Sequence, residues 1–326
     1  MTMRTESRDP LICGPTAVGK SALALELAAR NNGEIVSLDS MQIYRGMDIG
    51  TATPSPDEMA RVPHHLVNCH PLDYPSDAAT QIARAHAAVE EIHARGRTAV
   101  IAGGTAMYVK MFLDGICAAP PADEAVREEL REDAARAGSG ALHARLHEVD
   151  PETARKVHPN DLRRIIRALE VYRIAGTPLS SFQTQWRAAT QDAPYDLIGL
   201  TCPREELYSR INARVDRMMA EGLYEEVETC VRTGLESNQT ASQAIGYKEL
   251  IACLRGEMTR DEAVEAIKRN TRRFAKHQLT WFRKDPRITW CDVTVHTTPG
   301  ALADAVARWR MGDTSVCASP PPRLEK

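Results

Sequence analysis

GPTAVGKS, at residues 14–21, has the G-x-x-x-x-G-K-S spacing of a phosphate-binding loop. The apolar run 11–13 precedes it and the Ala- and Leu-rich stretch 22–30 follows it, which predicts a strand, the loop and then a helix. Loops of this kind turn backbone N–H groups toward an anion, and their lysine adds a positive charge. A glycine-rich turn before a surface helix is the alternative, and the complete pattern disfavours it. The sequence therefore predicts a di- or triphosphate site, with candidate ligands Gly14, Pro15, Thr16, Ala17, Val18, Gly19, Lys20 and Ser21.

The composition is that of an ordinary globular protein, long enough for two domains. The chain has 326 residues, 43% of them hydrophobic, and a net charge of −3. Because the charges nearly balance, contact with nucleic acid must depend on local basic patches. Residues 1–10 are polar, without the apolar region of a secretion signal, and no apolar run approaches the roughly 18 residues of a membrane span. We therefore expect a cytoplasmic protein that does not enter a membrane, with its eight cysteines as thiols. The oligomeric state stays open, with a monomer as the working assumption.

Three further apolar runs, 34–38, 98–102 and 197–201, have the character of buried parallel strands and are separated by helical patterns. This alternation predicts an α/β fold with a P-loop NTPase-like core, in which helices flank a mostly parallel sheet. Ligands of such sheets bind outside the carboxyl ends of the strands. Asp39-Ser40-Met41-Gln42 follows one of these strands and Gly103-Gly104-Thr105 follows another. We therefore expect a carboxylate, a hydroxyl and the phosphate loop to converge at one crevice.

Each of these signals has an alternative when it is taken alone. Asp39 could anchor Mg²⁺, as the second acidic element of an ordinary P-loop NTPase does, or it could cap the segment that follows. Thr105 could be the first residue of a helix cap after a turn. The occurrence of such signals at three successive strand ends favours a shared site.

The middle of the chain changes from alternating strands and helices to charged helical patterns at 124–136, 141–148 and 161–174. No strand pattern returns before residue 195, which predicts an all-helical insertion between two halves of the core. The predicted organisation is a first half of the core at 1–118, a helical insertion at 119–194, a second half of the core with basic helices at 195–311, and a disordered tail at 312–326.

Three of the predicted helices carry basic residues at helical spacing. The last insertion helix has four arginines, and the helix 204–222 places Arg210, Arg214 and Arg217 along one face. Between residues 268 and 284 the chain has seven Lys or Arg and no acid, interleaved with Phe274, Trp281 and Phe282. A solvated charged face is the alternative in each case, and the aromatic side chains are expected to anchor the core. Arginine and the basic-aromatic mixture favour phosphate or nucleic-acid contact.

In order along the chain, these features closely resemble the tRNA dimethylallyltransferases, also called tRNA isopentenyltransferases. The resemblance covers nearly the whole folded chain, from about residue 11 to residue 285. The stretches that carry it are GPTAVGKS (14–21), DSMQIYRGMDIGTATP (39–54), VPHHL (62–66), IAGGTAMYVK (101–110), HPNDLRRIIRALEVY (158–172), QAIGYKEL (243–250) and AKHQLTWFRKD (275–285).

The resemblance implies transfer of a dimethylallyl group from dimethylallyl diphosphate to N6 of the adenosine 3′ of the anticodon. It implies that the phosphate loop and a lid residue, Arg214, bind the diphosphate, with Mg²⁺ held by Ser21. Asp39 is then the general base that activates N6, and Thr105 stabilises the leaving group. The implied contacts with the tRNA anticodon stem-loop are Asp39, Ser40, Met41, Gln42, Thr105, Arg127, Arg163, Arg164, Ile165, Ile166, Arg167, Gln243, Gly246, Tyr247, Lys248, Lys276, His277, Gln278, Trp281 and Arg283.

One segment departs from the family pattern, and one other function remains open. Residues 67–77 lack the acidic stretch that relatives carry after the paired histidines, which leaves the structure of that connection uncertain. A metal cluster of His64, His65, Cys69 and His70 is disfavoured, because adjacent histidines do not easily face one ion. The alternative function is a small-molecule kinase or NTPase, since its phosphate loop has the same chemistry.

Overall fold

The computed structural model describes residues 8–183, 194–296 and 298–316. The chain divides into two compact units. The first, which we call the core unit, comprises Met1–Leu113 and Gln191–Lys326, and the second, the helical unit, comprises Asp114–Thr190. The predicted tail at 312–326 lies outside the described residues from residue 317 onward.

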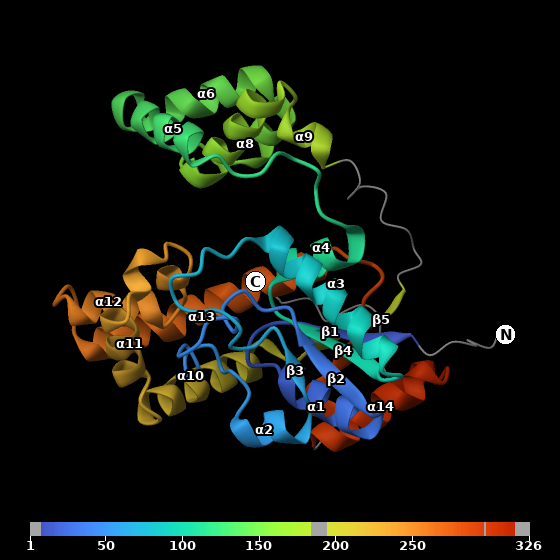
Figure 1. Ribbon diagram of the computed structural model, residues 1–326. Helices are drawn as coiled ribbons and strands as arrows, with labels where there is room; N and C mark the ends of the chain where they lie inside the picture. Colours follow the sequence, from blue (N-terminus) through green and yellow to red (C-terminus); the bar gives the residue numbers. More distant parts are fainter. Residues whose placement is uncertain (1–7, 184–193, 297, 317–326) are drawn as a thin grey trace. The chain divides into compact units, whose positions relative to one another are not determined.

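A sheet of six parallel strands forms the centre of the core unit (Figure 1), in the order β3-β2-β4-β1-β5-β6. The first strand lies in the middle, with Leu11 opposite Ile101 on one side and Leu197 on the other. The predicted P-loop α/β fold is therefore confirmed. The strands are β1 (Asp9–Cys13), β2 (Gly33–Ser37), β3 (His64–His65), β4 (Thr98–Gly103), β5 (Tyr195–Thr201) and β6 (Thr289–Asp292).

Two of the six strands were not predicted from the sequence. β3 consists of two histidines, which is too short to give an apolar run, and β6 joins the edge of the sheet through four residues of mixed polarity. The four predicted strands are present, with ends displaced by one or two residues.

Helices cover both faces of the sheet. α1 (Lys20–Arg30) and α14 (Pro299–Arg310) lie together on one face, and α3 (Ala78–Ala94) and α4 (Ala106–Asp114) lie on the other (Figure 1). α1 turns Leu23 and Leu27 inward at helical spacing, which gives it one buried face. This packing fixes the start of α1, and with it the loop that leads from β1.

A second apolar core of the core unit lies among four helices: α10 (Arg204–Ala220), α11 (Leu223–Arg232), α12 (Tyr247–Leu254) and α13 (Arg260–Phe282). The long connection after β2 contributes Ile43, Tyr44 and Met47 to this core. That connection also contains the short helix α2 (Pro56–Arg61), which Ser55 and Glu58 close with a capping box. The segment that follows Asp39 is therefore packed against helices from the second half of the chain.

The helical unit has an apolar core of its own. Leu130, Leu142, Leu146 and Leu169 are all buried in it. Its helices are α5 (Glu124–Ala137), α6 (Ser139–Val149), α7 (Pro151–Lys156), α8 (Leu162–Ala175) and α9 (Leu179–Phe182).

The structure also tests two expectations from the sequence, namely that the cysteines are thiols and that the chain has no membrane-spanning helix. Six described cysteines are free thiols, as expected, whereas Cys291 is disulfide-bonded, so the expectation was wrong for that residue. A helix long and apolar enough to span a membrane is absent from the described residues.

Candidate active site

The phosphate loop leaves the sheet at the end of β1 and is shaped by close packing against β5. Gly14 has φ +142°, and a side chain there would place its Cβ 2.7 Å from the carbonyl oxygen of Leu200. Both the backbone conformation and the contact with Leu200 therefore exclude a residue larger than glycine at position 14. Gly19, with φ +106°, caps α1 in the left-handed region. The N–H groups of Lys20, Ser21 and Ala22, which begin α1, have no hydrogen-bond partner among the described residues.

Two positive charges of the core unit lie close together beside this loop. Lys20 donates a hydrogen bond from Nζ to the carbonyl oxygen of Pro15 at 2.7 Å. Burial and the nearby Arg214 guanidinium lower the pKa of Lys20 to about 8. Burial also lowers the pKa of Arg214, which has no ion pair or hydrogen bond among the described residues. Desolvated cations that repel each other are stabilised by an anion, so this pair is suited to bind one.

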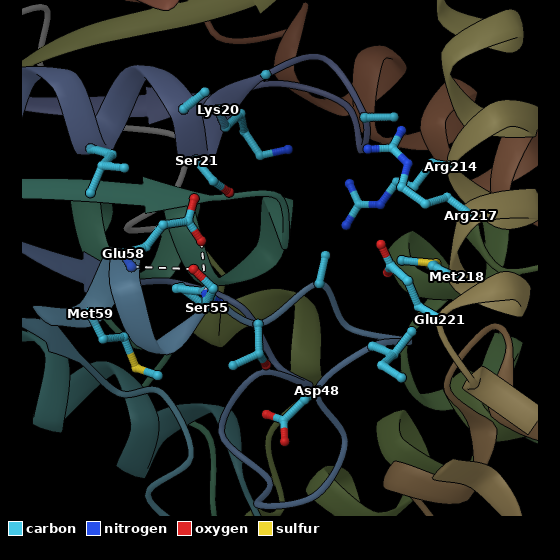
Figure 2. A pocket seen from close by; sticks show the side chains of 18 of the residues that line it. Lys20, Ser21, Asp48, Ser55, Glu58, Met59, Arg214, Arg217, Met218 and Glu221 are labelled. Carbon is cyan, nitrogen blue, oxygen red and sulfur yellow. Dashed lines mark hydrogen bonds between the residues drawn. The ribbon is translucent and has the colours of Figure 1, made fainter. Parts of the chain in front are cut away.

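A cavity of about 880 Å³ lies between the start of α1, α10 and the 48–59 segment. Figure 2 shows Lys20 and Ser21 on one side of it and Arg214 and Arg217 on the other. The predicted arginine face of α10 therefore lines the cavity together with the phosphate loop. The rest of the lining is mixed: Leu25, Ile49, Met59 and Met218 are apolar, whereas Asp48, Glu58 and Glu221 are acidic. The cationic end suits a phosphate group, and the apolar side chains suit a hydrocarbon group of the same ligand.

Asp39 lies at a smaller cavity of about 60 Å³, which Lys20 and Ser21 also line. Its Oδ1 accepts hydrogen bonds from the N–H groups of Met41 at 2.8 Å and Gln42 at 3.3 Å. Its Oδ2 has no partner among the described residues. The capping interpretation and the catalytic interpretation are thus compatible, because one oxygen orders the turn and the other is left to accept a proton.

Two side chains hold the segment after Asp39 in place. Gln42 accepts a hydrogen bond from the Ser37 hydroxyl at 2.9 Å and donates to the carbonyl oxygens of Thr51 and Ala52 at 3.3 and 3.1 Å. Glu226 of α11 accepts from three consecutive backbone N–H groups, at positions 48, 49 and 50, with distances from 2.7 to 3.1 Å. The wall of the larger cavity is therefore fixed by buried polar contacts.

Thr105 lies two residues after the end of β4. Its backbone carbonyl oxygen accepts a hydrogen bond from the N–H of Val109 in the first turn of α4. It does not line either of the two cavities, whereas Gly104 lines the smaller one. A Cβ on Gly104 would lie 3.4 Å from Lys20 Nζ, so this turn directly adjoins the phosphate loop. The structure thus brings the turn that carries Thr105 to the predicted crevice.

Oxygen ligands at the loop fit the predicted Mg²⁺. Ser21 is exposed at the start of α1 and lines both cavities. Hard cations such as Mg²⁺ take oxygen ligands and retain bound water and phosphate oxygens. No group of three or more His, Cys, Asp or Glu side chains that could hold a metal occurs in the described part of the chain. The Ser21 hydroxyl would therefore act together with oxygen atoms of the diphosphate and of water.

The predicted tRNA contacts of the core unit separate into exposed and buried residues. Lys276, His277 and Trp281 are exposed on α13, Arg283 is half-buried there, and Gln243 is exposed before α12. Lys248 is half-buried and lies 3.7 Å from Glu249 Oε1. The buried predicted contacts are Gly246, Tyr247 and Gln278.

Tyr247 needs a correction, because its side chain is fully buried and its hydroxyl donates to Glu226 at 2.6 Å. Its role is to hold the residue that anchors the 48–50 segment. The expectation that the aromatics of α13 anchor the core is confirmed for Phe282, which is buried. It is wrong for Phe274 and Trp281, which are 43% and 42% exposed.

In the helical unit, two predicted contacts are exposed and two are held by a buried acid. Arg163 and Arg164 are exposed on α8. Glu170 is fully buried and pairs with Arg127 at 2.9 Å and Arg167 at 2.6 Å. Arg127 also lies 3.9 Å from the exposed Glu124. Because Arg127 and Arg167 share the carboxylate of Glu170, both remain candidates for a phosphate contact.

Ile165 and Ile166 were predicted to contact tRNA, and this needs correction. Their side chains are 0% and 6% exposed in the core of the helical unit. The family motif includes them because it spans a whole amphipathic turn of α8, in which the arginines face outward and the isoleucines face inward.

The divergent 67–77 segment is ordered by polar contacts of its own. His70 is buried, stacks on Tyr74 with ring centroids 3.7 Å apart, and lies 2.6 Å from an Arg84 nitrogen through Nε2. Burial lowers the pKa of His70, which favours the neutral ring that can accept this hydrogen bond. Its backbone N–H donates to Ile43, so the segment supports the connection that follows Asp39.

Lys20 predicts a pH dependence of anion binding. Its pKa of about 8 means that the charged form is lost as the pH rises above that value. If only the charged form binds, the Kd for inorganic diphosphate should rise about fivefold between about pH 8 and about pH 9. Calorimetric titration across this range checks the prediction. Lys20→Arg is the control, because arginine stays charged and its profile reports only the ionisation of diphosphate. Identical profiles for the two proteins would contradict the prediction.

The sequence analysis found one neighbour of Arg214 and missed another residue of the site. Arg217, which the spacing on α10 placed on the same face as Arg214, lines the cavity with it, whereas Glu226 was missed. Glu226 had no such signal, because its importance arises from a fold contact with residues 48–50 that are far away in the sequence.

Comparison with known proteins gives consistent similarities over most of the chain. A family model described as IPP transferase matches residues 42–285. The tRNA dimethylallyltransferase of Geobacter sulfurreducens is 51% identical over 284 residues, which are 86% of this chain and 91% of the relative. That of Syntrophobacter fumaroxidans is 49% identical over 298 residues, 91% of this chain and 86% of the relative.

Solved structures show the same similarity. The full-length tRNA isopentenylpyrophosphate transferase from Bacillus halodurans is 40% identical with a TM-score of 0.68, covering 95% of this chain and 98% of its own. A structure of a eukaryotic dimethylallyltransferase acting on tRNA is 26% identical with a TM-score of 0.74, covering 93% of this chain and 79% of its own.

Proposed function

This chain belongs to the IPP transferase family of tRNA dimethylallyltransferases, and from that premise we propose that it transfers the dimethylallyl group of dimethylallyl diphosphate to tRNA. The proposed acceptor is N6 of the adenosine 3′ of the anticodon. The observation that carries the proposal is the pairing of an anion site, formed by Lys20 and Arg214, with the Asp39 carboxylate close by. A kinase or NTPase is not favoured by the family membership.

The proposed reaction breaks the bond between the allylic carbon and the diphosphate oxygen and forms a bond from that carbon to N6. Negative charge grows on the diphosphate as it leaves, and the phosphate loop, Lys20 and Arg214 stabilise it. Mg²⁺ bound at Ser21 would add to this neutralisation. The proton released from N6 passes to Oδ2 of Asp39, the oxygen that has no partner among the described residues.

The acceptor base must leave the anticodon loop to reach such a crevice, as in other base-modifying enzymes. The exposed basic and aromatic residues of α13 support contact with a single-stranded loop, because stacking and phosphate contacts are the usual means of binding one. The exposed arginines of α8 support contact with the stem of the anticodon arm. A tRNA substrate is also consistent with the predicted cytoplasmic location.

Transfer of radiolabel from dimethylallyl diphosphate to unmodified tRNA tests this function, with ATP hydrolysis measured in parallel. We expect labelling that depends on Mg²⁺, labelling of tRNA but not of free AMP, and no ATP turnover. ATP turnover without labelling would replace the proposal with a kinase or NTPase function. Labelling of AMP in place of tRNA would show that the acceptor is a free adenine nucleotide.

A further inference from the structure

Gln278 differs from its neighbours on α13 because it points into the protein. Its side chain is 5% exposed, whereas Lys276, His277 and Trp281 are exposed. It was predicted to contact tRNA through the same motif as these neighbours. Burial makes direct contact with RNA by its side chain unfavourable, so another role has to account for it.

Both ends of the Gln278 amide form hydrogen bonds with backbone atoms of the crevice. Oε1 accepts the N–H of Thr16 in the phosphate loop at 2.8 Å. Nε2 donates to the carbonyl oxygen of Gly104, in the turn before Thr105, also at 2.8 Å. Because one partner is a donor and the other an acceptor, only one orientation of the amide satisfies both. The side chain therefore bridges two segments that follow neighbouring strands of the sheet.

The fit around this bridge is tight. A Cβ on Gly104 would lie 2.8 Å from Gln278 Nε2, so the turn approaches the amide as closely as a glycine allows. On the other side, Thr16 lies between Pro15, whose carbonyl oxygen holds Lys20 Nζ, and Ala17, whose φ is +64°. A left-handed conformation at a non-glycine residue requires support from its surroundings, and the bond at Thr16 supplies a fixed point next to it.

We infer that Gln278 is a positioning residue, which fixes the distance between the phosphate loop and the Thr105 turn. Within the described residues its amide forms hydrogen bonds with the backbone of Thr16 and Gly104 and none with Lys20 or Arg214, so it acts through that backbone. This inference rests on the proposed function, because the two segments are the proposed binding site of the diphosphate and of its leaving-group contact. Through Gln278, the basic helix α13 holds the phosphate loop by a hydrogen bond to Thr16.

The test compares Gln278→Met with the wild-type protein in two binding assays. Methionine has nearly the same length but forms neither hydrogen bond. We expect the Kd for inorganic diphosphate with Mg²⁺, measured by calorimetry, to rise about tenfold, as the loss of two buried hydrogen bonds implies. We expect the Kd for tRNA, measured by filter binding, to stay within about twofold, because the exposed face of α13 is unchanged.

Gln278→Glu gives a second measurement that a general loss of stability would not reproduce. A protonated glutamic acid has the acceptor and the donor of glutamine, whereas the carboxylate lacks the donor. Diphosphate affinity of Gln278→Glu, relative to wild type at each pH, should therefore recover as the pH falls from about 8 to about 5.5. Gln278→Met should show no such recovery. Thr280→Val is the matched control on α13, since within the described residues the Thr280 hydroxyl donates to the carbonyl oxygen of Lys276 and to no other group.

Each outcome decides between distinct explanations. Diphosphate affinity equal to wild type in Gln278→Met would overturn the positioning role while leaving the proposed function intact. Weaker tRNA binding with normal diphosphate binding would also overturn the positioning role, because it would show that Gln278 contacts RNA directly. If the wild-type protein itself does not bind diphosphate, the proposed function fails. That outcome is distinguishable, because the positioning role is judged from the ratio of the variant Kd to the wild-type Kd.

Discussion

Asp39→Asn is expected to lower kcat for transfer to tRNA by about 10²- to 10⁴-fold, the usual contribution of a general base. Asparagine keeps the Oδ1 acceptor that orders the N–H groups of Met41 and Gln42, so the turn should survive. It lacks the carboxylate that would accept the N6 proton. Single-turnover transfer at saturating substrates measures the effect, and the Kd values for tRNA and diphosphate should change only a few-fold.

Asp77→Asn is the matched control for this substitution. Asp77 caps α3 by accepting the N–H of Thr80 at 2.8 Å, so it makes the same kind of backbone contact, and it lines neither of the two cavities. An unchanged kcat in Asp39→Asn would contradict the general-base role. Recovery of activity at high Mg²⁺ concentration would assign Asp39 to metal binding, the alternative that the sequence left open.

Arg214→Ala is expected to lower kcat/KM for dimethylallyl diphosphate by about 10²- to 10³-fold, as the loss of one preorganised contact to a developing anion does. Without a bound anion, Arg214 lowers the stability of the folded protein, because its guanidinium is desolvated and lies near the positive charge of Lys20. The substitution should therefore raise the Tm of the ligand-free protein and move the pKa of Lys20 upward toward its ordinary value. Steady-state kinetics and thermal unfolding measure the two effects.

Arg204→Ala is the control on the same helix. Arg204 is exposed and stacks over the Tyr208 ring at 5.1 Å, so its removal should leave kcat/KM within a few-fold of wild type. A fall in both activity and ligand-free Tm for Arg214→Ala would contradict the interpretation, because it would show that the arginine supports the fold.

The parts of the fold that could be predicted from sequence are those set by local patterns. The phosphate loop depends on glycines at fixed spacing, and four strands depend on apolar runs. β3 has neither signal, because its two histidines form a strand only through pairing with Ile35 and Val36 of β2. Short edge strands of this kind are determined by tertiary structure.

The candidate site was predictable as a set of residues but not as a set of orientations. The motif at 158–172 contains arginines and isoleucines together, and only packing against the core of the helical unit separates the outward from the inward side chains. Gln278 and Tyr247 were assigned to tRNA for the same reason, and both are buried. A motif records which positions matter, whereas burial and hydrogen-bond partners indicate why they do.

The strand order also determines when the site can come into existence during synthesis. β1 is made first, yet its two neighbours are β4 and β5, and β5 is translated only after the entire helical unit. Helices with sequence-local contacts form faster than sheets closed over long loops, so the helical unit should fold before the sheet is complete. Gly14 packs against Leu200, and Thr16 depends on Gln278. The phosphate loop is therefore synthesised well before the segments that shape it, and its conformation can be completed only after residues 200 and 278 have been translated.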